Sequence, residues 1–225
     1  MIRLEKSEAL NRKIRQDDLP DLGIPTWTLV HEAMQVGNID KALEFMEYGL
    51  TESQVMHDAL VSFVDNVLTH LAGFGEEEVE KIMRKGFYNN ISDWLKTTPG
   101  VEETVKRYAE IQRGHFSEFI VTEEPDRYVI RYDPCGSGGR LRRTKDVATT
   151  KKAYPWSWGR ISVPYYCCHC CLVNEIIPTE IRGYPIRITN PGEKPEDPCI
   201  HYYYKKPELI PEEYFTRIGM TKKTK

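Results

Sequence analysis

Four of the chain's six cysteines lie in one short stretch, Tyr165-Tyr166-Cys167-Cys168-His169-Cys170-Cys171. The other two each follow an Asp-Pro pair, in Asp133-Pro134-Cys135-Gly136 and in Asp197-Pro198-Cys199-Ile200-His201. No other part of the chain concentrates thiols and imidazoles in this way. We therefore expect a fold that brings these three cysteine segments together at one site.

The composition is that of an ordinary globular protein. Of the 225 residues, 40% are hydrophobic and 29% are charged, so the chain can bury a core without disulfide bonds. The formal net charge of -3 argues against a nucleic-acid partner held by broad electrostatic attraction. The longest apolar run is too short for a membrane helix, and the N-terminus lacks a signal-peptide core. We therefore predict a cytoplasmic protein without a membrane partner, whose reduced thiols serve metal binding or thiol chemistry.

Helical periodicity dominates the first half of the chain. Apolar residues recur at helical spacing between residues 51 and 71, where Thr51 and Gln54 have the spacing of a capping box. A separate short helix is predicted at residues 39–48, ending at Gly49. Two more are predicted at residues 76–85 and 101–112, the second after a break at Thr98-Pro99-Gly100.

The periodicity changes to two-residue alternation after His115, which predicts a hairpin at residues 119–132 and strands at 182–189 and 199–204. The predicted fold class is α+β, with an N-terminal helical bundle packed on a C-terminal, mainly antiparallel β-sheet. Its predicted segments are an N-terminal arm (1–21), a helical half (22–114), a β-rich half that carries the cysteine site (115–205) and a C-terminal tail (206–225). The arms at both termini favour a homodimer.

The cysteine spacing predicts a metal site. Cys167 and Cys170 form a C-x-x-C pair, the usual turn that presents two thiolates to one tetrahedral metal. Cys199 and His201 point to the same face if their segment is a strand. Zinc bound by Cys167, Cys170, Cys199 and His201, or by His169 in place of His201, is the expected cofactor. Four protein ligands indicate a structural zinc and three a catalytic one, and the spacing leaves this open.

Cys135 is the predicted nucleophile, because it lies between a predicted strand and a glycine-rich turn. The backbone N–H groups of Gly136, Ser137, Gly138 and Gly139 are expected to converge on a substrate anion. Arg140 is expected to bind the same anion through two hydrogen bonds. A tight turn with a small buried cysteine at its base is the alternative interpretation.

A cysteine nucleophile needs a base that generates its thiolate. His169 is the base that we favour, with His115 and His201 as alternatives. Glu175, or Glu180 as the alternative, is expected to orient that base or to donate a proton, on the ground that both follow the cysteine cluster.

Three late segments, Asp197-Pro198-Cys199, Tyr204-Lys205 and Pro211-Glu212-Glu213-Tyr214, resemble cysteine-containing proteins related to L-2-amino-thiazoline-4-carboxylate hydrolase. The helical first half is similar to that family as well, although the specific likeness covers only the last third of the chain. The doubled cysteines at 167–171 and the loop at 135–139 depart from the family pattern, which leaves the substrate open. The resemblance implies a hydrolase that opens a C–N or C–S bond in a small carboxylate-bearing molecule.

The sequence thus predicts a small-molecule hydrolase with a cysteine-rich, zinc-containing site. The first alternative is a non-enzymatic metal or small-ligand sensor domain with structural zinc. The second is a thiol redox protein, disfavoured because the cysteine cluster does not open a helix after a strand, the context that lowers the pKa of the first thiol.

Overall fold

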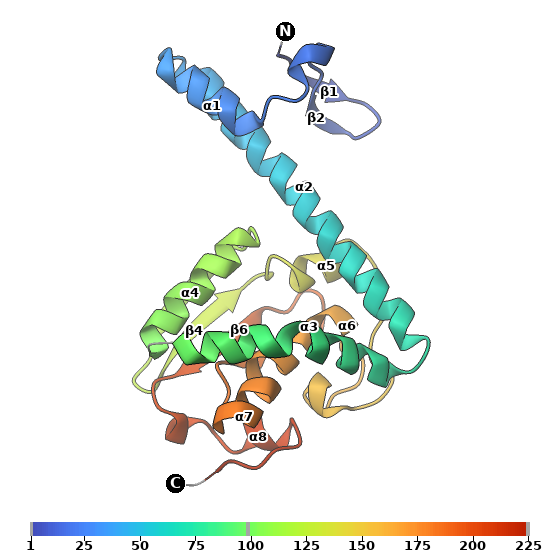
Figure 1. The fold of residues 1–225 in the computed structure, drawn as a ribbon, viewed down its shortest axis with the longest axis vertical. Coiled ribbons are helices and arrows are strands. Elements are labelled where there is room, and N and C mark those ends of the chain that lie inside the picture. The colour runs from blue at the N-terminus through green and yellow to red at the C-terminus, as the bar shows by residue number, and fades with distance from the viewer. Residues whose placement is uncertain (1, 98–99, 224–225) are drawn as a thin grey trace. The chain divides into compact units, whose positions relative to one another are not determined.

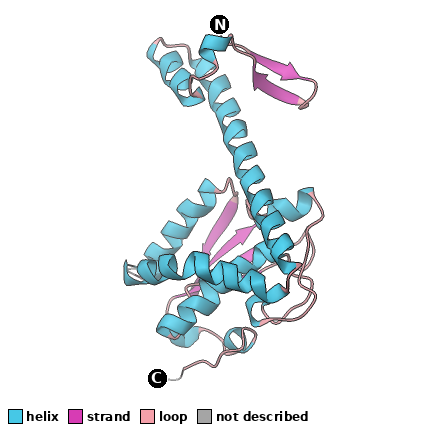
Figure 2. Cartoon of the chain, turned by 45° about the vertical axis from the view of Figure 1, so that its right-hand side comes forward, coloured by secondary structure: helices cyan, strands magenta, loops and turns pink. Residues whose placement is uncertain are grey.

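The computed structural model describes residues 2–97 and 100–223, and within them the fold is α+β, as predicted (Figure 2). The chain forms two compact units, residues 1–57 and 58–225. The division does not fall near residue 115, where the periodicity changes, because the helices after residue 76 share one core with the sheet. The predicted break at Thr98 and Pro99 lies outside the described residues.

The first unit begins with a β-hairpin where the sequence predicts only a charged arm. Its elements are β1 (Leu4–Ser7), β2 (Arg12–Arg15), η1 (Leu19–Asp21), α1 (Thr26–Gln35) and the start of α2 (Ile39–Ala72). Leu29, Val30 and Phe45 form its buried cluster. The guanidinium of Arg15 pairs with the buried carboxylate of Asp17 next to β2. This local ion pair helps to fix a hairpin that has no apolar alternation.

Helix α2 continues through Gly49, so the prediction of two separate helices here is wrong. A glycine inside a helix costs only about 1 kcal/mol relative to alanine, which packing can offset. A Cβ at Gly49 would lie 3.2 Å from the ring of Trp27, so glycine makes room for that ring. Thr51 does not cap a new helix but donates its hydroxyl hydrogen to the carbonyl of Glu47, one turn earlier.

The second unit joins helices to a four-stranded antiparallel sheet. After α2 its elements are α3 (Glu76–Thr97), α4 (Val101–Gly114), β3 (Phe119–Glu123), β4 (Arg127–Tyr132), α5 (Gly138–Thr144), η2 (Pro155–Ser157), α6 (Tyr165–Cys171), η3 (Leu172–Ile176), α7 (Ile177–Arg182), β5 (Ile188–Asn190), β6 (Cys199–Tyr204), η4 (Pro207–Leu209) and α8 (Glu213–Thr216). The strand order is β3-β4-β6-β5, and α4 lies against β6 (Figure 1).

The strand predictions are confirmed in part. The hairpin predicted at residues 119–132 corresponds to β3 and β4, and the strand predicted at 199–204 is β6. Of the strand predicted at 182–189, only the last residues belong to β5, because α7 extends to Arg182.

The cysteine cluster forms helix α6 and not the turn that its C-x-x-C spacing predicts. This helix continues through the π-helical segment η3 into α7. Pro178 explains the change of helical register, because it has no N–H to donate to the carbonyl of Asn174. That carbonyl accepts the N–H of Ile186 at 2.9 Å instead, which ties the segment before β5 to the helix.

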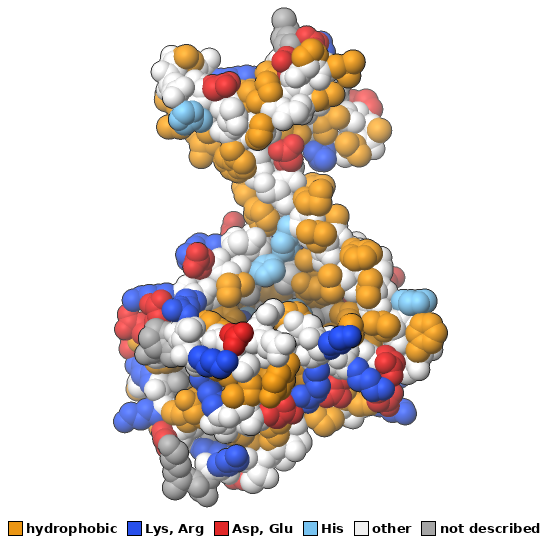
Figure 3. All heavy atoms as spheres, viewed as in Figure 1, with side chains coloured by type: hydrophobic (Ala, Val, Ile, Leu, Met, Phe, Trp, Pro, Cys, Tyr) orange, Lys and Arg blue, Asp and Glu red, His pale blue; other side chains and the backbone are white. Residues whose placement is uncertain are grey.

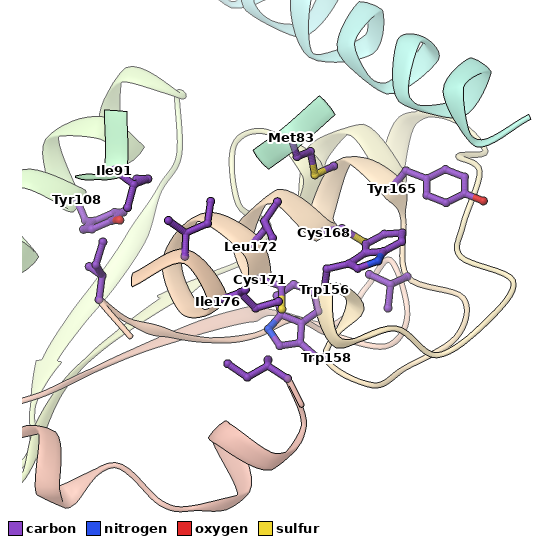
Figure 4. Close-up of a cluster of buried hydrophobic side chains, with 14 of the residues drawn as sticks. Met83, Ile91, Tyr108, Trp156, Trp158, Tyr165, Cys168, Cys171, Leu172 and Ile176 are labelled. Carbon is purple, nitrogen blue, oxygen red and sulfur yellow. The ribbon is translucent and has the colours of Figure 1, made fainter. Parts of the chain in front are cut away.

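The core of the second unit surrounds α6 and η3 (Figure 4). Cys168, Cys171 and Leu172 are fully buried and belong to the same apolar cluster as the rings of Trp156 and Trp158. The C-terminal segment, predicted as a peripheral tail, contributes Ile218 to this core and Ile210 and Phe215 to a separate buried cluster with Ile188 and Tyr204. Its residues Ile210, Phe215 and Ile218 are buried, so this prediction is wrong for most of the segment.

The surface has no single dominant charge on the face seen in Figure 3, where basic and acidic side chains are interspersed over the second unit. None of the helices in residues 2–97 and 100–223 combines the length and the apolar character that crossing a membrane requires.

Candidate active site

Helix α6 separates its four cysteines into two pairs. Residues three apart in a helix lie on one face, so Cys167 shares a face with Cys170, and Cys168 shares another with Cys171. Cys168 and Cys171 point into the core, where their thiols lie near the carbonyls of Pro164 and Pro155. Burial raises the pKa of both thiols well above 9.0. Only Cys167 and Cys170 are therefore available to a site.

The sheet contributes the next group through strand alternation. Cys199 and His201 lie two residues apart on β6 and face the same side, as predicted. Their register partners are Tyr132 on β4 for Cys199, and Ile130 on β4 and Thr189 on β5 for His201. The β6 face therefore presents a thiol and an imidazole toward the cysteine helix.

The loop before α5 contributes Cys135, and glycines let this loop approach its neighbours. A Cβ at Gly138 would lie 2.8 Å from the sulfur of Cys167, closer than such atoms approach. A Cβ at Gly136 would lie 2.0 Å from the carbonyl oxygen of His115. Any larger residue at either position would push the loop away from α6 or from the end of α4.

These three segments meet at one cavity of about 60 Å³. Its lining includes four of the six cysteines, Cys135, Cys167, Cys170 and Cys199, and three histidines, His115, His169 and His201. Ser137, Gly138, Arg187 and Thr189 line it as well, and none of its described lining residues is acidic. The convergence of the cysteine segments that the sequence predicts is therefore present, in a cavity whose fixed charge is positive.

Cys170 and His169 form a thiol–imidazole pair in this cavity. Nδ1 of His169 lies 2.5 Å from the carbonyl oxygen of Tyr166. A carbonyl can only accept, so Nδ1 carries the proton of the neutral ring and Nε2 is left as an acceptor. Nε2 lies 3.5 Å from Sγ of Cys170, in position to take the thiol proton. The Tyr166 carbonyl thus orients the imidazole as a base for Cys170.

The charge of Cys170 depends on its neighbours. Burial opposes ionisation of this thiol, but His169 and then Arg187 outweigh burial and lower its pKa from 9.0 to about 7. Burial likewise favours the neutral ring of His169, while Cys170 and the Tyr166 carbonyl raise the pKa of this histidine above 6.5. Near neutral pH a substantial fraction of the pair is therefore thiolate and imidazolium.

Arg187 is the buried cation of the cavity. The residue is 3% exposed, and its Nη2 donates a hydrogen bond to Sγ of Cys170 at 3.4 Å. Its guanidinium also lies over the ring of Tyr108, 4.6 Å from the centroid. Nε and Nη1 have no hydrogen-bond partner among the described residues. A buried guanidinium with unpartnered donors is costly for a fold and favourable for binding an anion.

The remaining thiols of the cavity are neutral at physiological pH. Burial raises the pKa of Cys135, Cys167 and Cys199, even though two backbone N–H groups next to Cys135 oppose this rise. His201 lies 3.6 Å from Sγ of Cys199, and burial lowers the pKa of this histidine well below 6.5. Cys199 and His201 are therefore a neutral pair, and Cys170 is the only lining cysteine whose pKa is lowered.

The predicted substrate role of the glycine-rich loop is not supported by its hydrogen bonds. The Gly139 N–H donates to Sγ of Cys135, and the Gly136 N–H donates to the hydroxyl of Ser117. Arg140 is directed away from the cavity and forms an ion pair with Asp58, with an N–O distance of 2.7 Å. Of the five residues predicted to bind substrate, only Ser137 and Gly138 line the cavity.

Glu175 is a structural residue and not the predicted partner of the base. Its fully buried carboxylate accepts from the indole of Trp158, the N–H of Thr189 and the guanidinium of Arg217. Burial raises its pKa, and Arg217 opposes this rise. These bonds join η3, β5 and the C-terminal segment. Glu175 does not line the cysteine cavity, so it has no contact through which to act on His169.

The four predicted zinc ligands, Cys167, Cys170, Cys199 and His201, all line the cavity. Among the described residues, no group of three or more His, Cys, Asp and Glu side chains has the arrangement of a metal site. The cluster does begin helix α6, but among the described elements η2 and not a strand precedes this helix, so the reason given from sequence against a redox role stands. In a redox C-x-x-C motif the first thiol is also the acidic one, whereas here the pKa of Cys167 is raised.

Sequence reasoning missed Arg187 and Asn174. Asn174 donates to the carbonyl of Cys170 at 2.9 Å and accepts from the hydroxyl of Tyr108, which fixes the end of α6. Arg187 lies between Ile186 and Ile188, and a lone cation flanked by apolar residues, with no acid beside it, is the sequence signal that could have identified it.

Comparison with known proteins provides no relative from which a role could be transferred, since no family model, curated protein or solved structure matches this chain.

Proposed function

We propose that this protein is a hydrolase that opens a C–N or C–S bond in a small carboxylate-bearing molecule, with Cys170 as the nucleophile. The observation that carries this proposal is the constellation of Cys170, His169 and Arg187 in one cavity. A lowered thiol pKa, an oriented base and an unpartnered cation are the parts that thiol catalysis on an anionic substrate needs. The resemblance of the last third of the chain to thiazoline-carboxylate hydrolases supports the same reaction class.

The proposed reaction has two steps. The Cys170 thiolate attacks the electrophilic carbon and forms a C–S bond with the enzyme, while the substrate's own C–N or C–S bond breaks. The leaving atom takes the proton that His169 carries on Nε2. A water molecule then gives a proton to His169, adds to the same carbon and releases the Cys170 thiolate. Each proton is returned within one turnover, so no further cofactor is needed.

Arg187 is the proposed carboxylate-binding residue, in place of Arg140. Nε and Nη1 have no partner among the described residues, and they lie on either side of Cδ, so either of them can donate to one oxygen of a carboxylate. Nη2 meanwhile contacts the attacking sulfur, at 3.4 Å. One side chain therefore links the recognition of substrate charge to the position of the nucleophile. The small cavity volume restricts the reacting part of the substrate to a few atoms.

The pH dependence of Cys170 alkylation tests the proposed pair. We expect the rate with iodoacetamide, followed by peptide mass spectrometry, to rise through about pH 7, because the thiolate is the reactive species and its pKa is lowered from 9.0. His169→Gln should move this rise toward pH 9, since it removes the largest favourable contribution to ionisation. A wild-type midpoint near 9 would contradict the proposal.

Zinc is the alternative use of the same cavity, because three thiols and an imidazole are the donors that zinc prefers. Arg187 opposes this alternative by placing a positive charge against the sulfur of Cys170. We therefore expect Cys170 alkylation to be unchanged by a strong chelator, and elemental analysis to find no stoichiometric zinc. Stoichiometric zinc whose removal accelerates alkylation would favour a zinc site at Cys167, Cys170, Cys199 and His201 instead. Unfolding of the protein when the zinc is removed would favour the alternative of a non-enzymatic sensor domain with structural zinc.

A further inference from the structure

A second cavity, of about 210 Å³, lies beside the strands β5 and β6. Ile188, Tyr202 and Tyr204 line it from these strands, and the start of α4 lines it from the helical side. Arg182, at the end of α7, and the connection from Tyr184 to Arg187 supply another wall, and Lys205, Pro207 and Ile210 line the cavity as well. Nothing in the proposed hydrolysis uses this cavity, apart from the presence of Arg187 in both linings.

Its lining carries three cations and, among the described residues, no acid. Lys205 is compensated by Glu123, whose carboxylate lies 2.6 Å from the ammonium. Arg182 donates only to the carbonyls of Tyr184 and Pro185, and no described carboxylate pairs with it. Arg187 likewise has no carboxylate partner in the described chain and keeps two unpartnered donors. Arg182 thus has no counter-charge, and the sulfur of Cys170 contacts only Nη2 of Arg187, so an anion in this cavity would gain from both guanidinium groups.

The rest of the lining is apolar or aromatic. Ile186, Ile188 and Ile210 supply aliphatic surface, and Tyr184, Tyr202 and Tyr204 supply rings. A bare inorganic anion would leave this surface in contact with water, whereas an apolar body would bury it at about 25 cal/mol per Å². The lining therefore matches a molecule that has an acid group at one end and a hydrophobic group at the other.

We propose that this cavity is a binding site for a small organic anion with an apolar body, held by Arg182 and Arg187 at its acid group. The site takes a hydrophobic carboxylate in preference to an uncharged analogue or to inorganic phosphate. This inference shares Arg187 with the hydrolase proposal, whereas Arg182 and Lys205 line this cavity and not the cysteine cavity, so variants at these two residues test it separately.

Calorimetric titration of the full chain with benzoate tests the inference, with benzamide and inorganic phosphate as matched probes. We expect benzoate to bind at least about tenfold more tightly than either, because charged hydrogen bonds and apolar burial both contribute. Arg182→Gln should lower the affinity for benzoate by about tenfold or more, and Arg182→Lys, which keeps the charge, should lower it by less. A circular-dichroism melt of each variant checks that the fold is retained. Lys205→Gln provides a second variant of the lining, and the loss of its surface ion pair with Glu123 should lower the stability of the fold only slightly.

Absence of benzoate binding, or equal affinity for benzamide, would overturn the inference. Benzoate binding that survives Arg182→Gln and Lys205→Gln but disappears after alkylation of Cys170 would place the anion in the cysteine cavity. That result also overturns the second site, while it leaves the hydrolase proposal intact. Conversely, tight benzoate binding in a chain whose Cys170 titrates near pH 9 would support this site and contradict the hydrolase.

Discussion

Replacing Cys170 with serine should lower kcat/KM for the proposed hydrolysis by at least about 10³-fold, because it removes the nucleophile itself. Serine has nearly the same volume as cysteine, and it is not ionised by His169 at neutral pH, so the fold should be kept while the attack is lost. The same variant should lose the alkylation that rises through about pH 7, since Cys170 is the only cysteine of the cavity with a lowered pKa. Both readouts use the full chain at pH 7.

Cys135→Ser is the matched control. Cys135 lines the same cavity and is also half-buried, but burial raises its pKa, so its thiol is protonated at neutral pH. Its loss should change turnover by less than about tenfold. The opposite ranking, with Cys135→Ser inactive and Cys170→Ser active, would restore the nucleophile that the sequence predicts. It would also show that a substrate changes the ionisation of the cavity thiols.

Arg187→Met should impair the site without destabilising the fold. Methionine fills a similar volume, and it removes a buried charge that has no carboxylate partner in the described chain. Replacing a buried ion pair with apolar groups of similar volume is often neutral or stabilising by about 1–4 kcal/mol, because the desolvation cost of the charges is removed, and Arg187 carries the same cost without a carboxylate to offset it. We therefore expect the free energy of unfolding in urea to be unchanged or higher. A charged residue whose removal costs no stability is retained for function.

The functional loss in Arg187→Met is measured with two alkylating agents of the same shape. Iodoacetate carries a carboxylate and iodoacetamide does not, so the ratio of their rates at Cys170 reports on the carboxylate site. We expect this ratio to fall by about tenfold or more when the guanidinium is removed. The pKa of Cys170 should also rise, because Arg187 is one of the two groups that lower it.

Arg217→Met is the control for Arg187→Met, because Arg217 is the partner of a buried carboxylate. Its Nη2 lies 2.8 Å from Glu175, whose carboxylate is fully buried. Removing one partner of such a pair leaves a charge uncompensated and costs about 3–5 kcal/mol. The iodoacetate preference should be retained in this variant. Equal destabilisation by the two substitutions would contradict the assignment of Arg187 as a binding residue.

Local sequence features determined a substantial part of this protein. Alternation on the strands placed Cys199 and His201 on one face, and the three cysteine segments do line one cavity. The α+β class and the hairpin at residues 119–132 also follow from periodicity. Such features are readable because the spacing of side chains along a strand or helix is fixed by backbone geometry.

Tertiary structure decided which of the cysteines is reactive. Spacing alone makes Cys167, Cys170 and Cys135 equivalent soft groups, whereas their pKa values depend on burial and on neighbours distant in the chain. Arg187 reaches Cys170 because Pro178 releases the carbonyl of Asn174, which then accepts the N–H of Ile186. The structure does not support the predicted roles of Arg140 and Glu175, for the same reason. Their partners, Asp58 and Arg217, lie 82 and 42 residues away, and no local pattern encodes such pairs.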